Sequence, residues 1–287
     1  MSLKKLKGYQ IITNAKGQEL YMPSQTYDVV NKLLDVGTPV FMYGAKGTSK
    51  TETAQALAIE RGYAGSEFFQ METGAVTSGD QLDGYTSIDP STRMLKMIPS
   101  ELLSAVRLAS SGTRTFLNAD ELNRVSVPSA LNKLLRLLSQ DSYATDLEGI
   151  LELGGNLTFM ATANVGYRGT TRLNEALMDR FDAIELKAIG GEALREVLSD
   201  RYGAVAASDV QKIQKFVDQN QKAAQRDDYE GTLVSTRDAL RIARGLTIGM
   251  TGMEAVEILV GGQVAIAQGG REALNALIAE AKAQFAA

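Results

Sequence analysis

The segment from Pro39 to Thr51 constrains the fold more than any other part of the chain. An apolar run, PVFM at 39–42, leads into YGAKGTSKT at 43–51, and a helix-forming stretch follows. Glycines allow consecutive backbone N–H groups to converge on phosphate oxygens, and the N-terminus of the next helix adds partial positive charge. The order of strand, glycine-rich loop and helix therefore predicts an α/β core that binds a nucleoside triphosphate.

The side chains of this loop suit the same chemistry. Lys50 can reach the terminal phosphates, and the Thr51 hydroxyl can ligate Mg²⁺. The residues expected to contact the nucleotide are Gly44, Ala45, Lys46, Gly47, Thr48, Ser49, Lys50, Thr51 and Glu52. Ser49 departs from the usual pattern G-x-x-x-x-G-K-[ST], in which glycine precedes the lysine, and its β-carbon could crowd the phosphates. Serine is small, however, and Gly44 and Gly47 can still supply the tight turn. The alternative is an ordinary glycine-rich turn.

Polar residues follow two further apolar segments. Residues 115–121 read TFLNADE, and the strand expected at 157–162 is followed by Asn164. Because the carboxyl ends of parallel strands face the ligand crevice, we expect Asp120 to hold Mg²⁺ through its water shell and Glu121 to polarise the attacking water. Asn164 is a candidate sensor that orients this water. Taken alone, Asp120 could be a solvated helix cap and Asn164 a turn former.

Composition excludes several classes of chemistry. The 287 residues include no cysteine and no histidine, and the formal net charge is −4. Disulfides, thiolate zinc sites, cysteine nucleophiles and histidine-based catalysis are therefore excluded. The negative charge does not favour nucleic acid as a partner, although a local basic patch remains possible. No apolar run approaches the roughly 20 residues of a membrane span, and the first residues lack an apolar signal core, so we expect a cytoplasmic protein.

Hydrophobic periodicity predicts alternating strands and helices in the first two thirds of the chain. The expected strands lie at 39–42, 66–71, 113–117, 157–162 and 183–186. Expected helices include 27–35, 51–61 and one over 128–138 with Ser126 as its cap. This alternation predicts a parallel five-stranded sheet with helices on both faces. Beyond Gly190 and Gly191 only helical patterns continue, and the chain is long enough for two domains. We therefore expect one domain over 1–189, with an insertion at about 74–100, and a second over 190–287.

Five motifs in a fixed order resemble the AAA+ ATPases, specifically the MoxR group with its helix-two insertion. The motifs are GAKGTSKT, FLNADELNR, FMATAN, LNEALMDRF and STRDALRIAR. The resemblance covers roughly residues 25–246. It implies a P-loop NTPase core, an all-α lid domain, and hydrolysis of ATP with Mg²⁺ as the metal ion.

The resemblance also implies roles for individual residues. Walker A matches Lys50 and Thr51, Walker B matches Asp120 and Glu121, sensor 1 matches Asn164, and sensor 2 matches Arg237. Arg180 falls where the family places the arginine finger that reaches into the neighbouring subunit's site, and Arg172 is a second candidate. A guanidinium fork suits the charge spread over a transferring γ-phosphoryl group. The alternative for Asp179 and Arg180 is a surface ion pair at a helix end.

An arginine supplied by another chain implies assembly. The resemblance implies a closed homo-oligomeric ring, six subunits being the expected number, since head-to-tail contacts must close to avoid filaments. It also implies chaperone-like remodelling of a protein client, with a von Willebrand A domain protein as a candidate partner. Related insertions project toward the pore or a partner, and Tyr85, Met94, Leu95 and Met97 would suit such contacts. The alternative is a small hairpin that packs these residues locally.

Three other functions are compatible with a phosphate loop. One is a nucleic-acid motor or loader, which the net charge of −4 disfavours. Another is a nucleotide-gated scaffold with weak hydrolysis, with Ser49 as the cause, although the presence of Glu121 argues against it. The third is a small-molecule kinase, which the second helical domain and the adjacent Asp120 and Glu121 disfavour.

Overall fold

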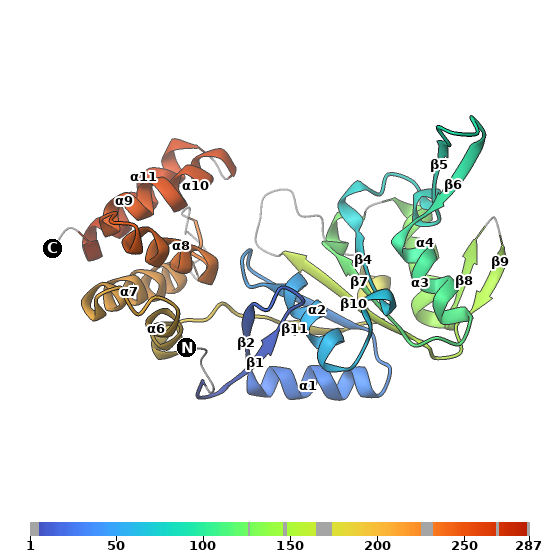
Figure 1. Cartoon of the computed structure of the whole chain (residues 1–287), viewed down its shortest axis with the longest axis horizontal. Coiled ribbons are helices and arrows are strands. Elements are labelled where there is room, and N and C mark those ends of the chain that lie inside the picture. Colours follow the sequence, from blue (N-terminus) through green and yellow to red (C-terminus); the bar gives the residue numbers. More distant parts are fainter. Residues whose placement is uncertain are drawn as a thin grey trace. The chain divides into compact units, whose positions relative to one another are not determined.

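The computed structural model describes residues 6–125, 127–145, 148–164, 174–224, 232–267 and 270–285 (Figure 1). The chain divides into two compact units. The first, here called the α/β unit, comprises residues 10–44 and 49–186. The second, here called the helical unit, comprises the described residues of 1–9, 45–48 and 187–287.

A five-stranded sheet forms the centre of the α/β unit. The strands, in spatial order, are β11 (Asp182–Glu185), β3 (Val40–Gly44), β10 (Leu157–Asn164), β7 (Thr115–Asp120) and β4 (Phe68–Glu72). Every neighbouring pair is parallel, as expected from the sequence. Because all five strands run in the same direction, their carboxyl ends lie at one edge of the sheet, and crossover connections join successive strands.

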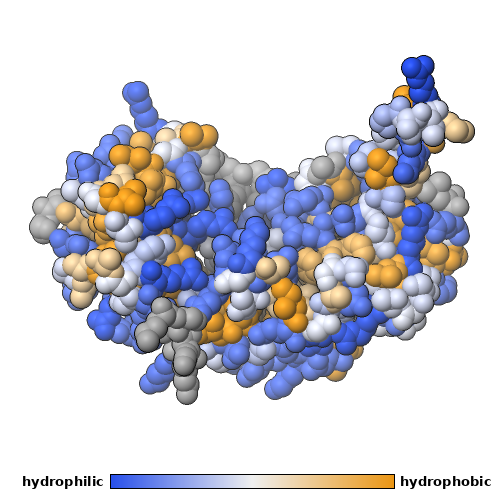
Figure 2. All heavy atoms as spheres, in the orientation of Figure 1, coloured by the Kyte–Doolittle hydropathy of each residue, from blue (hydrophilic) through white to orange (hydrophobic). Residues whose placement is uncertain are grey.

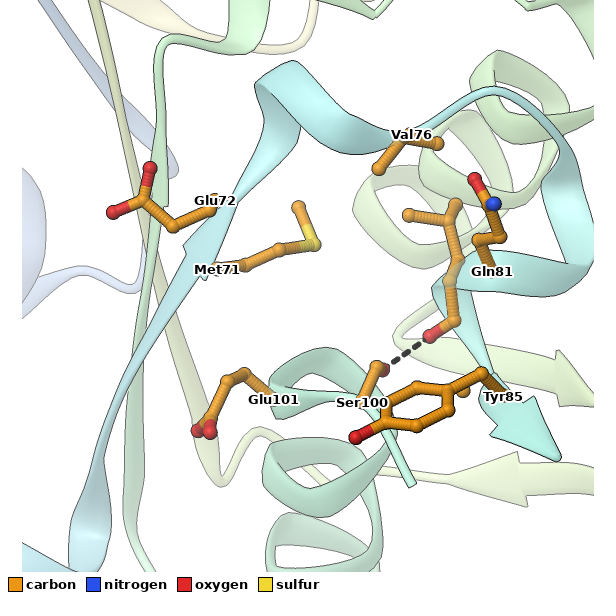
Figure 3. Close-up of a pocket in the computed structure, with 9 residues that line it drawn as sticks. Met71, Glu72, Val76, Gln81, Tyr85, Ser100 and Glu101 are labelled. Carbon is orange, nitrogen blue, oxygen red and sulfur yellow. Dashed lines mark hydrogen bonds between the residues drawn. The ribbon is translucent and has the colours of Figure 1, made fainter. Parts of the chain in front are cut away.

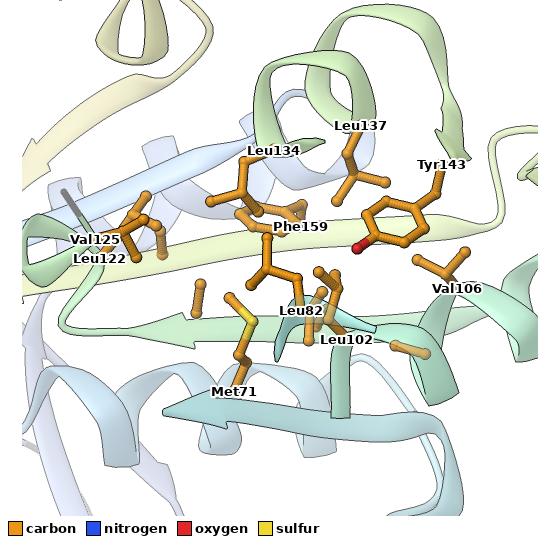
Figure 4. Packing of buried hydrophobic residues seen from close by; sticks show 14 of the residues in the cluster. Met71, Leu82, Leu102, Val106, Leu122, Val125, Leu134, Leu137, Tyr143 and Phe159 are labelled. Carbon is orange, nitrogen blue, oxygen red and sulfur yellow. The ribbon is translucent and has the colours of Figure 1, made fainter. Parts of the chain in front are cut away.

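Helices cover both faces of this sheet, which confirms the expected layers. Adjacent residues of a strand point to opposite faces, and β10 shows this directly. Met160 belongs to a buried cluster with residues of α1 (Ser24–Asp35) and α2 (Lys50–Glu60). Phe159 belongs to the other cluster, with residues of α3 (Glu101–Ser110) and α4 (Pro128–Gln140), which Figure 4 shows. The sheet is therefore the middle of three layers.

All five strands differ from the sequence expectation by one to three residues at one or both ends. β4 begins at Phe68 rather than at 66, and β7 begins at Thr115 and continues to Asp120 rather than ending at 117. The reason is strand pairing. Asn118 and Ala119 of β7 each pair with a residue of β4 on one side and of β10 on the other, so the strand continues through them although Asn118 is polar. Asp120 is thus the last residue of the strand. The helix expected over 128–138 is α4, whose N-cap is Val127, and Ser126 lies outside the described residues.

Two antiparallel hairpins of the α/β unit have no counterpart in the sequence expectations. They consist of β1 (Tyr9–Thr13) with β2 (Glu19–Pro23), and of β8 (Ser142–Thr145) with β9 (Gly149–Glu152). Their strands are only four or five residues long. Strands this short carry too few alternations to be distinguished from loop sequence.

The insertion contains a third hairpin, formed by β5 (Gly84–Ile88) and β6 (Leu95–Pro99). The alternative of local packing fails for most of its apolar residues, because Tyr85, Met94 and Leu95 are 62%, 70% and 76% exposed. Met97 alone of the four packs against the buried cluster of α3 and α4. The insertion therefore contains a hairpin on which Tyr85, Met94 and Leu95 face solvent.

The described part of the helical unit beyond residue 187 contains helices and no strand. Its elements are α6 (Gly191–Arg201), α7 (Ala207–Ala223), α8 (Thr236–Thr247), α9 (Gly252–Glu254), a π-helical turn (Ala255–Gly261), α10 (Gly262–Ala267) and α11 (Arg271–Phe285). Val210, Ile213 and Phe216 are buried along α7, as their spacing predicts. Among the described helices, none is both long enough and apolar enough to cross a lipid bilayer.

Candidate functional site

The register of the sheet aligns several polar strand ends at the carboxyl edge of the α/β unit. Asn164 pairs with Gly44 across β10 and β3. Asp120 pairs with Glu72 across β7 and β4. Ala161 pairs with Ala119, so the next residue of β10, Thr162, lies beside Asp120. The phosphate loop leaves this same edge at Gly44, which is where parallel α/β sheets bind ligands.

The lysine of the phosphate loop lies at the beginning of α2. Lys50 is only 6% exposed, and its Nζ donates a hydrogen bond of 3.0 Å to the carbonyl oxygen of Gly44. Gly44 has a φ of +154°, and a β-carbon there would lie 2.4 Å from the carbonyl oxygen of Leu186. Only glycine fits this position without displacing the backbone. The glycine therefore allows the chain to leave β3 at Gly44, and the hydrogen bond from Lys50 to Gly44 joins the two ends of the phosphate loop.

The backbone of Ser49 explains why a glycine commonly precedes the lysine. Ser49 is the N-cap of α2 and adopts the left-handed conformation, with φ 60° and ψ 30°. A side chain in this conformation crowds its own backbone, which costs about 1–2 kcal/mol. The loop thus keeps the left-handed turn although the residue is serine.

Replacing this serine with glycine tests whether the conformation is strained. Ser49→Gly should raise the free energy of unfolding by about 1 kcal/mol, because glycine adopts a positive φ without the clash. Urea unfolding would measure the gain. Arg93→Gly is the matched control, since Arg93 has a φ of 58° in the insertion hairpin. A loss of stability in Ser49→Gly alone would show that the serine side chain contributes more than its backbone costs.

The carboxylate of Asp120 faces the first turn of α2. The Thr51 hydroxyl donates to Asp120 Oδ1 at 2.8 Å, and the Thr162 hydroxyl donates to the same oxygen. Among the described residues there is no group of three or more acidic side chains that could enclose a metal. A carboxylate beside a hydroxyl is nevertheless the hard-oxygen pair that suits Mg²⁺, which usually takes one or two protein ligands together with phosphate oxygens and water. These two residues fit such an ion.

The neighbouring carboxylate, Glu121, is held from two sides. Asn164 Nδ2 donates to Glu121 Oε1 at 2.9 Å, and Arg124 Nε lies 2.7 Å from Glu121 Oε2. Asn123 Nδ2 donates to the backbone oxygen of Asn164 at 3.1 Å. Glu121 itself has a φ of 54°, so the backbone reverses direction there. Because of this turn, the two adjacent acids make different contacts: Asp120 accepts from Thr51, and Glu121 accepts from Asn164.

Besides Asn123, three residues of this network are absent from the sequence expectations. Thr162 and Arg124 contact the two acids, and the Thr73 hydroxyl lies 2.6 Å from the carbonyl oxygens of both Asp120 and Glu121. Thr162 carried a signal, because it lies two residues before Asn164 and shares its face of the strand. Thr73 carried none, since its contact depends on how β4 pairs with β7.

The arginine expected to act on a neighbouring subunit lies away from the phosphate loop of its own chain. Arg180 precedes β11, whose first residue, Asp182, pairs with Val40 at the start of β3. Gly44 is four residues further along β3, so about 13 Å of strand separates the two positions. The Arg180 side chain contacts the Ser139 hydroxyl and the backbone oxygen of Ala176. The alternative ion pair with Asp179 does not form between these two described side chains.

The other two arginines lie elsewhere. Arg237 is the second residue of α8 in the helical unit, two residues after the N-cap Ser235. Arg172 lies outside the described residues.

Comparison with known proteins supplies independent information on this site. Residues 39–181, about half of the chain, match the model of the AAA domain of the dynein-related subfamily. This span includes the phosphate loop, both acids, Asn164 and Arg180.

Two relatives match over most of this chain. One is a Thauera aromatica protein named "Putative chaperone BssE", which is 26% identical over 82% of this chain and 80% of its own length. The other is YojN of Bacillus subtilis, which is 26% identical over 73% of this chain and 66% of its own length. Among solved structures, NtrX from Brucella abortus in complex with ADP aligns with a TM-score of 0.46 and 13% identity, over 77% of this chain and 48% of NtrX. With its domain match and its sheet order, the chain belongs to the AAA+ ATPases, and its five motifs resemble those of the MoxR group.

Proposed function

We propose that this protein hydrolyses ATP with Mg²⁺ and uses the energy to remodel a protein client. The observation that carries the hydrolytic part is the pair of contacts at the end of β7. Asp120 faces Thr51 of the phosphate loop, and Glu121 faces Asn164 of the next strand. A site that separates metal binding from water activation in this way suits phosphoryl transfer to water.

Each residue then has a defined task. The backbone N–H groups of Gly44 to Glu52 cradle the phosphates, and Lys50 neutralises the terminal ones. Thr51 and Asp120 hold Mg²⁺, directly or through water, and the ion supplies charge neutralisation on the β- and γ-phosphates. Glu121 accepts a proton from the attacking water, while Asn164 orients that water.

Assembly completes the site in this proposal. Arg180 reaches the γ-phosphate of the neighbouring subunit in a closed ring of six, and Arg237 of the lid domain contacts the nucleotide. Residues 1–189 form the nucleotide-binding core and residues 190–287 the lid. The position of Arg180 at the amino edge of the sheet supports a role outside its own site, because its side chain contacts Ser139 and the backbone of Ala176 there.

Two observations support remodelling of a protein client. A relative carries a name that includes the word chaperone, at 26% identity. The insertion hairpin also exposes apolar side chains suited to contact with another protein. A von Willebrand A domain protein is the partner that the MoxR type suggests, and the cytoplasm is the compartment that we propose.

Loss of the loop lysine tests the nucleotide site. Lys50→Ala should abolish measurable ATP binding, because its ammonium group is the buried cation of the phosphate loop, whereas Lys46, the other lysine of the loop, is exposed. Isothermal titration with Mg-ATP measures the effect, and we expect an affinity loss of at least about 100-fold. Lys16→Ala, an exposed lysine in the turn between β1 and β2, is the control and should bind normally. Unchanged binding by Lys50→Ala would contradict the proposed site.

A nucleotide-gated scaffold is the alternative that one observation favours. The left-handed backbone at Ser49 places a β-carbon beside the expected phosphate position, which could slow hydrolysis without preventing binding. Such a scaffold would assemble with ATP and release almost no phosphate, and Ser49→Gly would increase its turnover. The formal net charge of −4 does not favour the nucleic-acid motor.

A further inference from the structure

A pocket of about 360 Å³ lies at the base of the insertion hairpin, between the ends of β4 and β6 (Figure 3). Met71, Val76, Leu82 and Tyr85 supply most of its apolar lining. Met71 and Leu82 are anchored in the core, with exposures of 5% and 1%, so this wall is fixed. Figure 3 shows the Met71 side chain directed into the space and the Tyr85 ring at its rim. The volume suits one or two large apolar side chains.

The rim of the pocket is acidic. Its described lining includes two carboxylates, Glu72 and Glu101, and no lysine or arginine. Figure 3 places both carboxylates on one side of the pocket, opposite Tyr85. Glu101 is the first residue of α3, and it has no hydrogen-bond or ion-pair partner among the described residues. An apolar side chain next to a lysine or arginine would therefore complement both the wall and the rim.

The hairpin above the pocket extends this surface. Tyr85 is the second residue of β5, and it is paired with Ile98 of β6. Further along, Ile88 pairs with Leu95, and these side chains are 63% and 76% exposed. Figure 2 shows the hairpin standing out from the α/β unit with apolar and hydrophilic atoms on it. An apolar hairpin without a partner beside an apolar pocket indicates a surface built for contact with another molecule.

We propose that the pocket binds an extended polypeptide segment in which large apolar side chains alternate with lysine or arginine. This inference rests on the proposed function, because the segment belongs to the protein client. An apolar side chain enters between Met71 and Tyr85, and a neighbouring basic side chain pairs with Glu101. Nucleic acid and anionic lipid do not fit, since both present negative charge to an acidic rim.

The pocket lies close to the hydrolytic site along the chain. Glu72 and Val76 line it, and between them lies Thr73, whose hydroxyl holds the backbone oxygens of Asp120 and Glu121. Gly74 packs beside the Arg124 side chain, since a β-carbon at Gly74 would lie 3.2 Å from Arg124 Cδ. A bound segment would thus contact Glu72 and Val76, which lie on either side of Thr73 in the chain, and Thr73 contacts the backbone of both acids.

Fluorescence anisotropy on the full chain tests the inference with three labelled eight-residue peptides. The first alternates phenylalanine and leucine with arginine and lysine. The second has glutamate in place of the basic residues, and the third has serine in place of the apolar ones. We expect the first peptide to bind at least about tenfold more tightly than either of the others, because each control loses one of the two complementary features.

Variants locate the binding on the protein. Glu101→Lys should weaken the first peptide about five- to tenfold, and Val76→Phe should weaken it by filling the pocket. Glu272→Lys is the matched control, because Glu272 is an exposed glutamate in the first turn of α11. Circular dichroism would show that each variant is folded. Absence of binding by the unmodified protein, equal binding of the acidic peptide, or equal binding by Glu101→Lys and Val76→Phe would overturn the inference.

A separate phosphate-release assay distinguishes this inference from the proposed function. ATP turnover without peptide binding would overturn the pocket assignment alone. Peptide binding that follows the expected variant pattern, in a protein that does not hydrolyse ATP, would support the pocket and overturn the proposed function.

Discussion

Glu121→Gln should stop ATP turnover while Mg-ATP still binds. Glutamine keeps an oxygen that can accept from Asn164 Nδ2, which lies 2.9 Å from Glu121 Oε1 in the unmodified protein. It has no negative charge and cannot take a proton from water. Removing a general base typically lowers the rate by about 10²–10⁴-fold, so phosphate release should fall by at least about 100-fold. Isothermal titration should show an affinity within about threefold of the unmodified protein, because Glu121 does not belong to the phosphate loop.

The substitution should leave the fold intact. The only charge pair it removes among those described is that with Arg124, whose side chain is 57% exposed. An ion pair this open to solvent contributes about 0–1 kcal/mol. Glu152→Gln, at the exposed end of β9, is the matched control and should keep full turnover. Residual turnover above about a tenth of normal would mean that another group activates water.

The relation between sequence and site differs among these residues for physical reasons. Thr51 and Asp120 could be placed together from sequence alone, because one begins a helix after a glycine-rich loop and the other ends a parallel strand. Parallel strands bring such ends to one edge whatever their order. The order itself is invisible in the sequence. It determines that Thr162 lies beside Asp120, and that β4 is the neighbour of β7.

Contacts made by short loops could not be predicted. Thr73 directly follows β4, and its hydroxyl contacts the backbone oxygens of the last residue of β7 and of the residue after it, which requires both strand ends to be in register. The Arg124 pair depends on the backbone reversal at Glu121, whose φ is 54°. Nothing in the residue type of a glutamate predicts a left-handed backbone. The hairpins before α1 and after α4 were missed because strands of four or five residues carry too few alternations to be distinguished from loop sequence.

Arg180→Ala should also stop turnover, through a different subunit. An arginine that reaches a neighbouring γ-phosphate is worth about 10³–10⁵-fold in rate, so we expect phosphate release to fall by at least about 100-fold. The variant should fold normally, because the contacts of the Arg180 side chain with described residues are the Ser139 hydroxyl and a backbone oxygen at the surface. Arg195→Ala, which removes an exposed arginine of α6, is the control and should keep full activity. Arg172→Ala, compared in the same assay, would show which of the two arginines carries the larger share.

Mixing two inactive variants separates a shared site from a site within one chain. An Arg180→Ala subunit has an intact phosphate loop, and a Lys50→Ala subunit has an intact arginine. In an equal mixture, about one quarter of the interfaces join an intact loop to an intact arginine, so phosphate release should return to about a quarter of normal. If each chain used its own arginine, no mixture would recover any activity. Native mass spectrometry must show mixed rings in the same sample, and mixed rings without recovery would contradict the shared site. The strand geometry favours recovery, because Asp182, two residues after Arg180, pairs with Val40, and about 13 Å of β3 separates Val40 from Gly44, where the loop begins.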